Sequence, residues 1–201
     1  MVSNEEISVN KRNGRGKESL NIEKIHSMVG FATEGITGVS ASHVEMNSGI
    51  QFFDGVSTAD IQQILIKSAN DLISLENPNY QYVAARLLLF QLRKQLFHRL
   101  WDHPKFIDHI KTLIDKGLYD KDILVNYDES EIDRMGMWVD HERDYNFTYA
   151  GLRQVMDKYL VQDRSTGDIF ETPQFMYMMI SATLFAKYPI ESRLQYVKKY
   201  Y

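Results

Sequence analysis

The chain has 201 residues, of which 44% are hydrophobic and 25% are charged, and its formal net charge is −4. This is the composition of an ordinary globular protein, and the acidic balance argues against a general nucleic-acid binder, because such proteins usually carry a net basic surface. The sequence contains no cysteine, which excludes disulfides, zinc–thiolate sites, iron–sulfur ligation and thiol nucleophiles within it.

The first hundred residues predict a short β-hairpin followed by helices. Alternating apolar and polar residues indicate a strand at 7–10, an Asn-Gly pair at 13–14 is typical of a tight turn, and the strand returns through 18–21. Apolar residues at helical spacing predict a helix over 22–34. Three further helices are expected from Ser40 or Ser42 to 51, from 57 onwards, and from 79 to 99. We therefore expect a small hairpin capping a four-helix bundle.

Residues 100–201 predict a second helical segment, so we place a boundary between two domains, 1–99 and 100–201. Its helices are expected at 102–117, 121–126, 129–138, 148–160, 172–186 and 190–201. A glycine turn indicates a second short hairpin at 161–170. The last helix has no stop signal, so we expect its apolar side to pack against further polypeptide. The fold class is thus mainly α.

Four helix starts carry recognisable caps. Ser42 with Glu45 has the spacing of a capping box, and Ser-Thr-Ala-Asp at 57–60 is a second helix-start signature. Asp102 is expected to cap the next helix, with Pro104 in its first turn. Thr172-Pro173 is expected to open the most apolar helix.

The first hairpin carries a cluster of basic residues. Lys11, Arg12, Arg15 and Lys17 lie close together in sequence around two glycines. Such a loop either closes over phosphate groups or is a solvated hairpin tip, and the loop alone does not separate the two. A triphosphate needs several cations together with hydroxyl or backbone donors. Further groups of this kind are Lys24, Ser57, Thr58, Arg93, Lys94 and Arg99, and Glu18 and Asn21 suit the edge of a base.

Several stretches resemble one known family. KRNG, LNIEKI, QFFDGVSTADI and NPNYQYVAARLLLFQLRK are similar, in this order, to the ATP cone of the large subunit of class I ribonucleotide reductase. DHERDYNFTYAGL, KYLVQDRSTGDIFETPQFMYMMISATLF and RLQYVKKYY resemble the helical segment that follows the cone. The resemblance covers nearly the whole chain, and it is greatest to the enterobacterial and T-even-like phage versions.

The resemblance implies a site for ATP or dATP, bound with Mg²⁺. The matched residues are Lys11, Arg12, Lys24, Thr58 and Lys94 for phosphate, Glu18 and Asn21 for adenine, and Phe90 elsewhere in the nucleotide site. Gln62 stands where many members have a histidine that faces phosphate, and Phe31 stands where some have tryptophan. The hairpin tip is also one residue longer than in the enterobacterial pattern.

The resemblance further implies a regulatory role within a cytoplasmic oligomer. In the family, the cone controls the reduction of ribonucleotides to deoxyribonucleotides, and that chemistry needs cysteines that this chain does not contain. We therefore expect the chain alone to be inactive. Activity would require the remainder of the large subunit, on the same or a separate polypeptide, and a radical-generating small subunit. No nucleic acid or membrane partner is expected.

Two other classes of protein remain open on the sequence. A free-standing ATP-cone sensor would bind nucleotide without belonging to an enzyme, although repressors of this kind carry a zinc ribbon with four cysteines. A helical protein-interaction domain would bind no nucleotide, so a nucleotide titration separates it from the other two.

Some conspicuous residues are better explained by structure than by chemistry. Asp-His-Glu-Arg-Asp at 140–144 has poor spacing for a metal site, so we expect a knot of ion pairs and hydrogen bonds. His103 and His109 are expected at the surface. The methionines of 176–179 are expected in a helical core. We predict no catalytic and no metal-binding residues in this chain.

Overall fold

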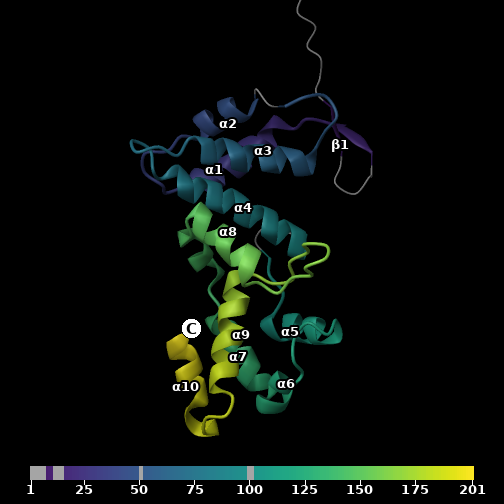
Figure 1. The fold of residues 1–201 in the computed structure, drawn as a ribbon, viewed down its shortest axis with the longest axis vertical. Helices are drawn as coiled ribbons and strands as arrows, with labels where there is room; N and C mark the ends of the chain where they lie inside the picture. Colours follow the sequence, from purple (N-terminus) through teal and green to yellow (C-terminus); the bar gives the residue numbers. More distant parts are fainter. Residues whose placement is uncertain (1–7, 11–15, 50–51, 99–101) are drawn as a thin grey trace, which may run out of the picture. The chain divides into compact units, whose positions relative to one another are not determined.

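The structure is a computed structural model that describes residues 8–10, 16–49, 52–98 and 102–201 (Figure 1). The described part is mainly helical, which confirms the predicted fold class. It forms two compact units. The first comprises residues up to 91 together with 145–152, and the second comprises residues 92–144 together with 153–201. The boundary at 99/100 stays a prediction. In the described ranges, no helix is both long and apolar enough to cross a membrane.

The first unit contains a small sheet and the predicted bundle helices. Its elements are β1 (Ser8–Asn10), β2 (Lys17–Ser19), α1 (Ile22–Thr33), α2 (Ala41–Gly49), β3 (Val56–Ser57), α3 (Thr58–Asp71) and most of α4 (Tyr80–Phe97). The strands lie in the order β2-β1-β3, with β1 antiparallel to β2 and parallel to β3. The hairpin and the four helices are confirmed, whereas the two-residue strand β3 was not predicted.

The core of this unit is built around α4. Along α1, Ile25, Val29 and Ala32 are buried at helical spacing, and α3 buries Leu65 in the same way. Between 80 and 90, α4 is buried round most of its circumference. The buried members there are Tyr80, Val83, Ala84, Ala85, Leu87, Leu88, Leu89 and Phe90. A helix that is apolar on nearly every side is typical of a central element.

The expected capping box at Ser42 is not formed. Helix α2 begins at Ala41, so Ser40, the other expected cap, directly precedes the helix and Ser42 lies inside it. Glu45 accepts from His26 of α1 at 2.9 Å. A capping box does form at the start of α3, where Ser57 and Asp60 satisfy each other's backbone N–H groups. The signature at 57–60 was therefore correct. The box at Ser42 was wrong because the helix begins before Ser42, at the position that the alternative cap Ser40 predicts.

The second unit is mainly helical. Its elements are the end of α4, α5 (Phe106–Asp115), α6 (Asp122–Asn126), α7 (Glu129–Trp138), the 3₁₀ helix η1 (His141–Asn146, shared at its end with the first unit), most of α8 (Tyr149–Lys158), α9 (Pro173–Phe185) and α10 (Ile190–Tyr200). One hydrophobic core joins α5, α6, α7, α9 and α10. The predicted methionine core is confirmed for Met176 and Met178, which are both buried.

Two predictions at the start of α5 were wrong. The helix begins at Phe106, so neither Asp102 nor Pro104 lies in its first turn. The residue before a proline avoids helical backbone angles, and His103 instead stacks on His141 with ring centroids 3.7 Å apart. His109 is only 5% exposed, because it lies on the same side of α5 as Phe106.

The predicted hairpin at 161–170 is a tight turn with a single bridge. Gln162 pairs with Ile169, and Phe170 donates its N–H to the carbonyl of Val161 at 2.9 Å. Gly167 adopts a φ of 78°, which closes the turn in a conformation that glycine accepts most readily. Beyond the turn, Thr172 caps α9 as expected.

Candidate functional site

The sheet joins the start of α3 to the two strands that flank the basic loop in sequence. Val9 of β1 pairs with Glu18 of β2, and Asn10 of β1 pairs with Ser57 of β3. Asp54 accepts both the N–H and the hydroxyl of Ser8, at 2.8 and 2.6 Å. These bonds from Ser8 hold the pKa of the Asp54 carboxyl below its usual value. Residues before α3 are thus tied to the strand that leads into the basic loop.

The start of α1 brings two predicted residues together. Asn21 is the N-cap of the helix, and its side-chain oxygen accepts the N–H of Lys24 at 2.9 Å. Both side chains are exposed, and Glu18 lies three residues earlier, half-buried on β2. The positive end of a helix dipole favours negative charge at this position.

At the start of α3, the side chains of Ser57 and Asp60 are used for capping the helix. The hydroxyl of Ser57 donates to the Asp60 carboxylate at 2.6 Å and accepts the N–H of Asp60 at 3.0 Å. Thr58 is the first residue of the helix and takes no part in this box. Thr58, rather than Ser57, therefore has the hydroxyl suited to a ligand, although the Asp60 carboxylate nearby disfavours phosphate.

The two predicted residues on α4 differ in exposure. Phe90 is 1% exposed and lies edge-on to Tyr145, with ring centroids 6.3 Å apart. Lys94 is exposed in the last turn of the helix and belongs to the second unit. Phe90 is thus part of a packed core, whereas Lys94 presents its charge at the surface.

Gln62, which departs from the family pattern, is held inside the first unit. It is 5% exposed, and its amide nitrogen donates to the carbonyl of Leu87 at 2.8 Å. The side chain therefore joins α3 to α4. Lys11 and Arg12, by contrast, lie outside the described residues.

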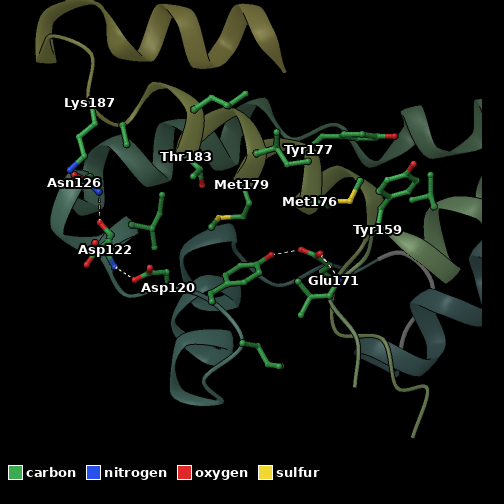
Figure 2. A pocket seen from close by; sticks show the side chains of 18 residues that line it. Asp120, Asp122, Asn126, Tyr159, Glu171, Met176, Tyr177, Met179, Thr183 and Lys187 are labelled. Carbon is green, nitrogen blue, oxygen red and sulfur yellow. Dashed lines mark hydrogen bonds between the residues drawn. The ribbon is translucent and has the colours of Figure 1, made fainter. Parts of the chain in front are cut away.

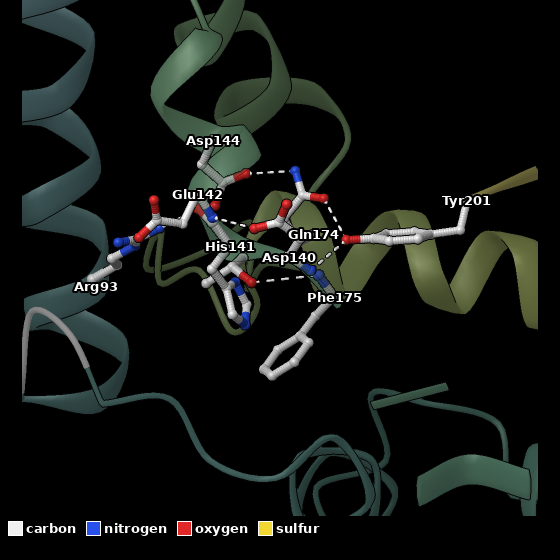
Figure 3. A network of polar contacts seen from close by, with 9 residues as sticks. Arg93, Asp140, His141, Glu142, Asp144, Gln174, Phe175 and Tyr201 are labelled. Atoms are coloured by element: carbon white, nitrogen blue, oxygen red, sulfur yellow. Dashed lines mark hydrogen bonds and ion pairs between the residues drawn. The ribbon is translucent and has the colours of Figure 1, made fainter. Parts of the chain in front are cut away.

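A buried polar network occupies the second unit (Figure 3). Arg93 of α4 donates to the carbonyl of His141 at 2.7 Å, and Asp144 accepts from Gln174 at 2.8 Å. The hydroxyl of Tyr201 donates to the side-chain oxygen of Gln174 at 2.7 Å. Burial raises the pKa of Asp144 to about 6, against the lowering effects of the Gln174 hydrogen bond and the Arg93 charge. The knot expected at 140–144 is confirmed, but its partners on α4, α9 and α10 were not predicted.

A hollow of about 860 Å³ lies elsewhere in the second unit (Figure 2). Its walls are mainly apolar and include residues of α6 and α9, and no predicted nucleotide residue lines it. Its charged lining residues are three acids, Asp120, Asp122 and Glu171, and one base, Lys187. Glu171 is buried, accepts from Tyr119, and has a raised pKa because of that burial. A cavity with this balance of charge is unsuited to a triphosphate.

No group of side chains suited to bind a metal ion is found among the described residues. Across the ranges that the structure describes, no three histidine, aspartate or glutamate side chains are grouped to hold an ion.

Two family models match parts of the chain. Residues 7–95 match the ATP cone domain, and residues 145–201 match the ribonucleotide reductase all-alpha domain. An ATP cone is a nucleotide-effector domain, so effector binding is what this match indicates for the first part.

Full-length relatives were also found. The ribonucleoside-diphosphate reductase subunit alpha of Haemophilus influenzae is 47% identical over 98% of this chain, and subunit 1 alpha of Escherichia coli is 46% identical over 98%. The subunit alpha of Enterobacteria phage T4 is 42% identical over 97%. The chain spans only about a quarter of these relatives, 26%, 26% and 25% of their lengths. Through its ATP cone and its all-alpha sequence, nearly the whole chain is thus similar to the N-terminal part of ribonucleotide reductase alpha subunits.

Proposed function

We propose that the chain is the effector-binding part of a ribonucleoside-diphosphate reductase and that it binds ATP or dATP with Mg²⁺. The observation that carries this proposal is the arrangement around the sheet of the first unit. There β1 lies between Glu18 on β2 and the β3 strand that leads into Thr58. Asn21 and Lys24 follow directly at the start of α1.

The chemistry of these residues fits an adenine nucleotide. Lys24 and Lys94 supply cations for phosphate, together with Lys11 and Arg12 of the hairpin loop, and charge-assisted hydrogen bonds contribute about 1.5–3 kcal/mol each. The Asn21 oxygen is used by the cap, which leaves its NH₂ group as a donor to a base acceptor. Glu18 offers a carboxylate to the exocyclic amine of adenine.

The binding test is calorimetry with Mg-ATP on the folded chain, with one matched pair of variants. Lys94→Met removes a cation from the proposed site and is expected to weaken binding about 10- to 150-fold, the equivalent of one charge-assisted contact. Lys67→Met is the control, because Lys67 is an exposed lysine of α3 that pairs with Asp71 at 2.7 Å. It should change the Kd less than about twofold.

Two results would refute nucleotide binding at this site. One is the absence of heat with millimolar Mg-ATP when circular dichroism shows a folded chain. The other is an equal loss from the two lysine variants, which would indicate general attraction of an anion to surface charge.

We further propose that the complete subunit reduces ribonucleoside diphosphates. The chain has no cysteine, so this chemistry depends on thiols in the remainder of the subunit and on a radical-generating small subunit. Mixing the chain with those polypeptides should give nucleotide-regulated reduction. If reduction is unaffected by the chain although ATP binds to it, the free-standing sensor is the correct reading.

A further inference from the structure

A continuous series of polar contacts begins one residue before Lys94. Arg93 is only 2% exposed, and its terminal Nη2 lies 2.7 Å from the carbonyl oxygen of His141 and 3.6 Å from Oδ2 of Asp144. Oδ1 of Asp144 accepts from Gln174, which in turn accepts from the Tyr201 hydroxyl. Figure 3 shows this series running from α4 through η1 and α9 to the end of α10.

The contact between Arg93 and Asp144 is incomplete. A distance of 3.6 Å is too long for a hydrogen bond. Oδ2 of Asp144 is buried, and it has no hydrogen-bond partner among the described residues. An unsatisfied buried carboxylate oxygen is unfavourable, because the group has lost its hydration without gaining a donor.

A second arrangement of Arg93 lies close to the observed one. A movement of about 0.7 Å would bring Nη2 within hydrogen-bond distance of Oδ2. In that position one N–H of Nη2 donates to the charged carboxylate, while its second N–H can still donate to the His141 carbonyl. Charge-assisted hydrogen bonds are the stronger kind, and the movement gives Oδ2 the donor that it lacks. The two arrangements of Arg93 therefore differ in one strong contact, and a ligand that favours either arrangement can shift the balance between them.

The position of Lys94 connects this element to the nucleotide. Lys94 follows Arg93 directly on α4, and its exposed ammonium is the group that we assign to phosphate. Since the helix backbone is hydrogen-bonded from turn to turn, a force on residue 94 displaces residue 93 with it.

We propose that nucleotide bound at Lys94 draws Arg93 into hydrogen-bond contact with the Asp144 carboxylate, and that Gln174 and Tyr201 carry this change to the end of α10. The proposal rests on the proposed function, because it needs phosphate at Lys94. It assigns positioning roles to Arg93, Asp144 and Gln174 in effector signalling.

The first test is hydrogen exchange of the whole chain with and without saturating Mg-ATP. Backbone amides of 140–146 and 197–201 are expected to change their exchange rates severalfold. Helix α5 lies in the same unit but outside the network, and it should change less than about twofold, which separates a relay from general stabilisation by ligand. Equal changes in all three segments, or none in the network segments, would overturn the relay.

Variants test the order of the contacts. Asp144→Asn keeps the oxygen that Gln174 bonds and removes the charge to which Arg93 would move. This variant should still bind ATP but lose the response at 197–201. Tyr201→Phe should keep the response at 140–146 and lose it at 197–201. Tyr200→Phe is the matched control, because Tyr200 is 60% exposed, and it should respond like the parent chain.

The outcomes separate the two proposals. If the parent chain binds no ATP, the proposed function fails and the relay fails with it. If ATP binds and Asp144→Asn or Tyr201→Phe retains the response at 197–201, only the relay fails. If Asp144→Asn does not fold, the comparison of Tyr201→Phe with Tyr200→Phe decides the question.

Discussion

The ion pair between Glu131 and Arg193 offers a direct test of the packing between α7 and α10. Both residues are 7% exposed. Arg193 donates through Nε to Oε1 of Glu131 at 2.9 Å and through Nη2 to Oε2. Its guanidinium also lies over the ring of Tyr127, 4.4 Å from the centroid. Arg193→Met removes the cation and leaves a buried carboxylate without its partner.

The loss of stability expected from Arg193→Met follows from leaving the buried Glu131 carboxylate unpaired. Breaking a buried pair at one partner costs about 3–5 kcal/mol, whereas replacing both partners by apolar residues is often near neutral. Glu131 additionally accepts the N–H of Asp128 at 3.1 Å as part of a capping box. The double variant Glu131→Leu/Arg193→Met should therefore lose about 1 kcal/mol for the cap. Most of the loss caused by Arg193→Met alone should be recovered.

Urea unfolding followed by tryptophan fluorescence measures this difference. The chain has two tryptophans, at 101 and 138, and Trp138 ends α7, the helix that carries Glu131. The emission of Trp138 consequently reports on the unit that contains the ion pair. If the free-energy losses of the two single variants simply add in the double variant, the pair is not coupled and the reasoning is wrong.

Three further predictions concern acidification and glycines. The pKa of His109 is lowered to about 4 and that of His141 to about 2, first by burial, while burial raises that of Asp144 to about 6. Below pH 6.5 the unfolded chain binds protons at both histidines before the folded chain does, so each histidine removes about 1.4 kcal/mol of stability per pH unit. Below pH 6 the folded chain binds a proton at Asp144 first, which returns a similar amount per unit, so the net loss between pH 6 and 4 is about 2.7 kcal/mol; a flat urea midpoint over this range would contradict it. Gly136→Val should destabilise the fold by about 1–3 kcal/mol, because an added Cβ meets Phe106 Cβ at 3.1 Å. Unchanged stability in the same urea assay would contradict this, because it would show that the core rearranges without cost. Gly30→Ala, with open space in mid-helix, should gain about 0.5–1 kcal/mol, and a loss in thermal or urea unfolding would contradict this.

Local patterns predicted most of the helices because their causes are local. The apolar spacing of 22–34 and the Thr172 cap act within one or two turns, and both elements form nearly as expected. The start of α5 and the absent box at Ser42 failed for another reason. Helix α5 begins only at Phe106 and α2 begins before Ser42, so neither Asp102 nor Ser42 stands at a helix end. Tertiary contacts form at both places, between His103 and His141 and between Glu45 and His26.

The candidate site stays a prediction, in which the family resemblance added Phe90 to residues that the chemistry of phosphate and adenine had already suggested. Nothing in the spacing of residues distinguishes buried Phe90 from the exposed Lys94 four positions later, since α4 has few polar residues to mark a surface side. The partners of Arg93 also escaped prediction. Asp144 lies 51 positions away, and such a pairing leaves no periodic signal in the chain.

The burial of α4 has a consequence for how this sequence can drift over evolutionary time. From Val83 to Phe90, only Arg86 is not fully buried, so a replacement there must keep both volume and shape to avoid a cavity or a clash. Leu75, which is 96% exposed between α3 and α4, meets no such restriction. In a saturating mutational library selected for nucleotide binding, accepted substitutions should be scarce along this stretch of α4 and abundant around Leu75. The first unit would then diverge mainly in its loops, around a central helix that changes slowly.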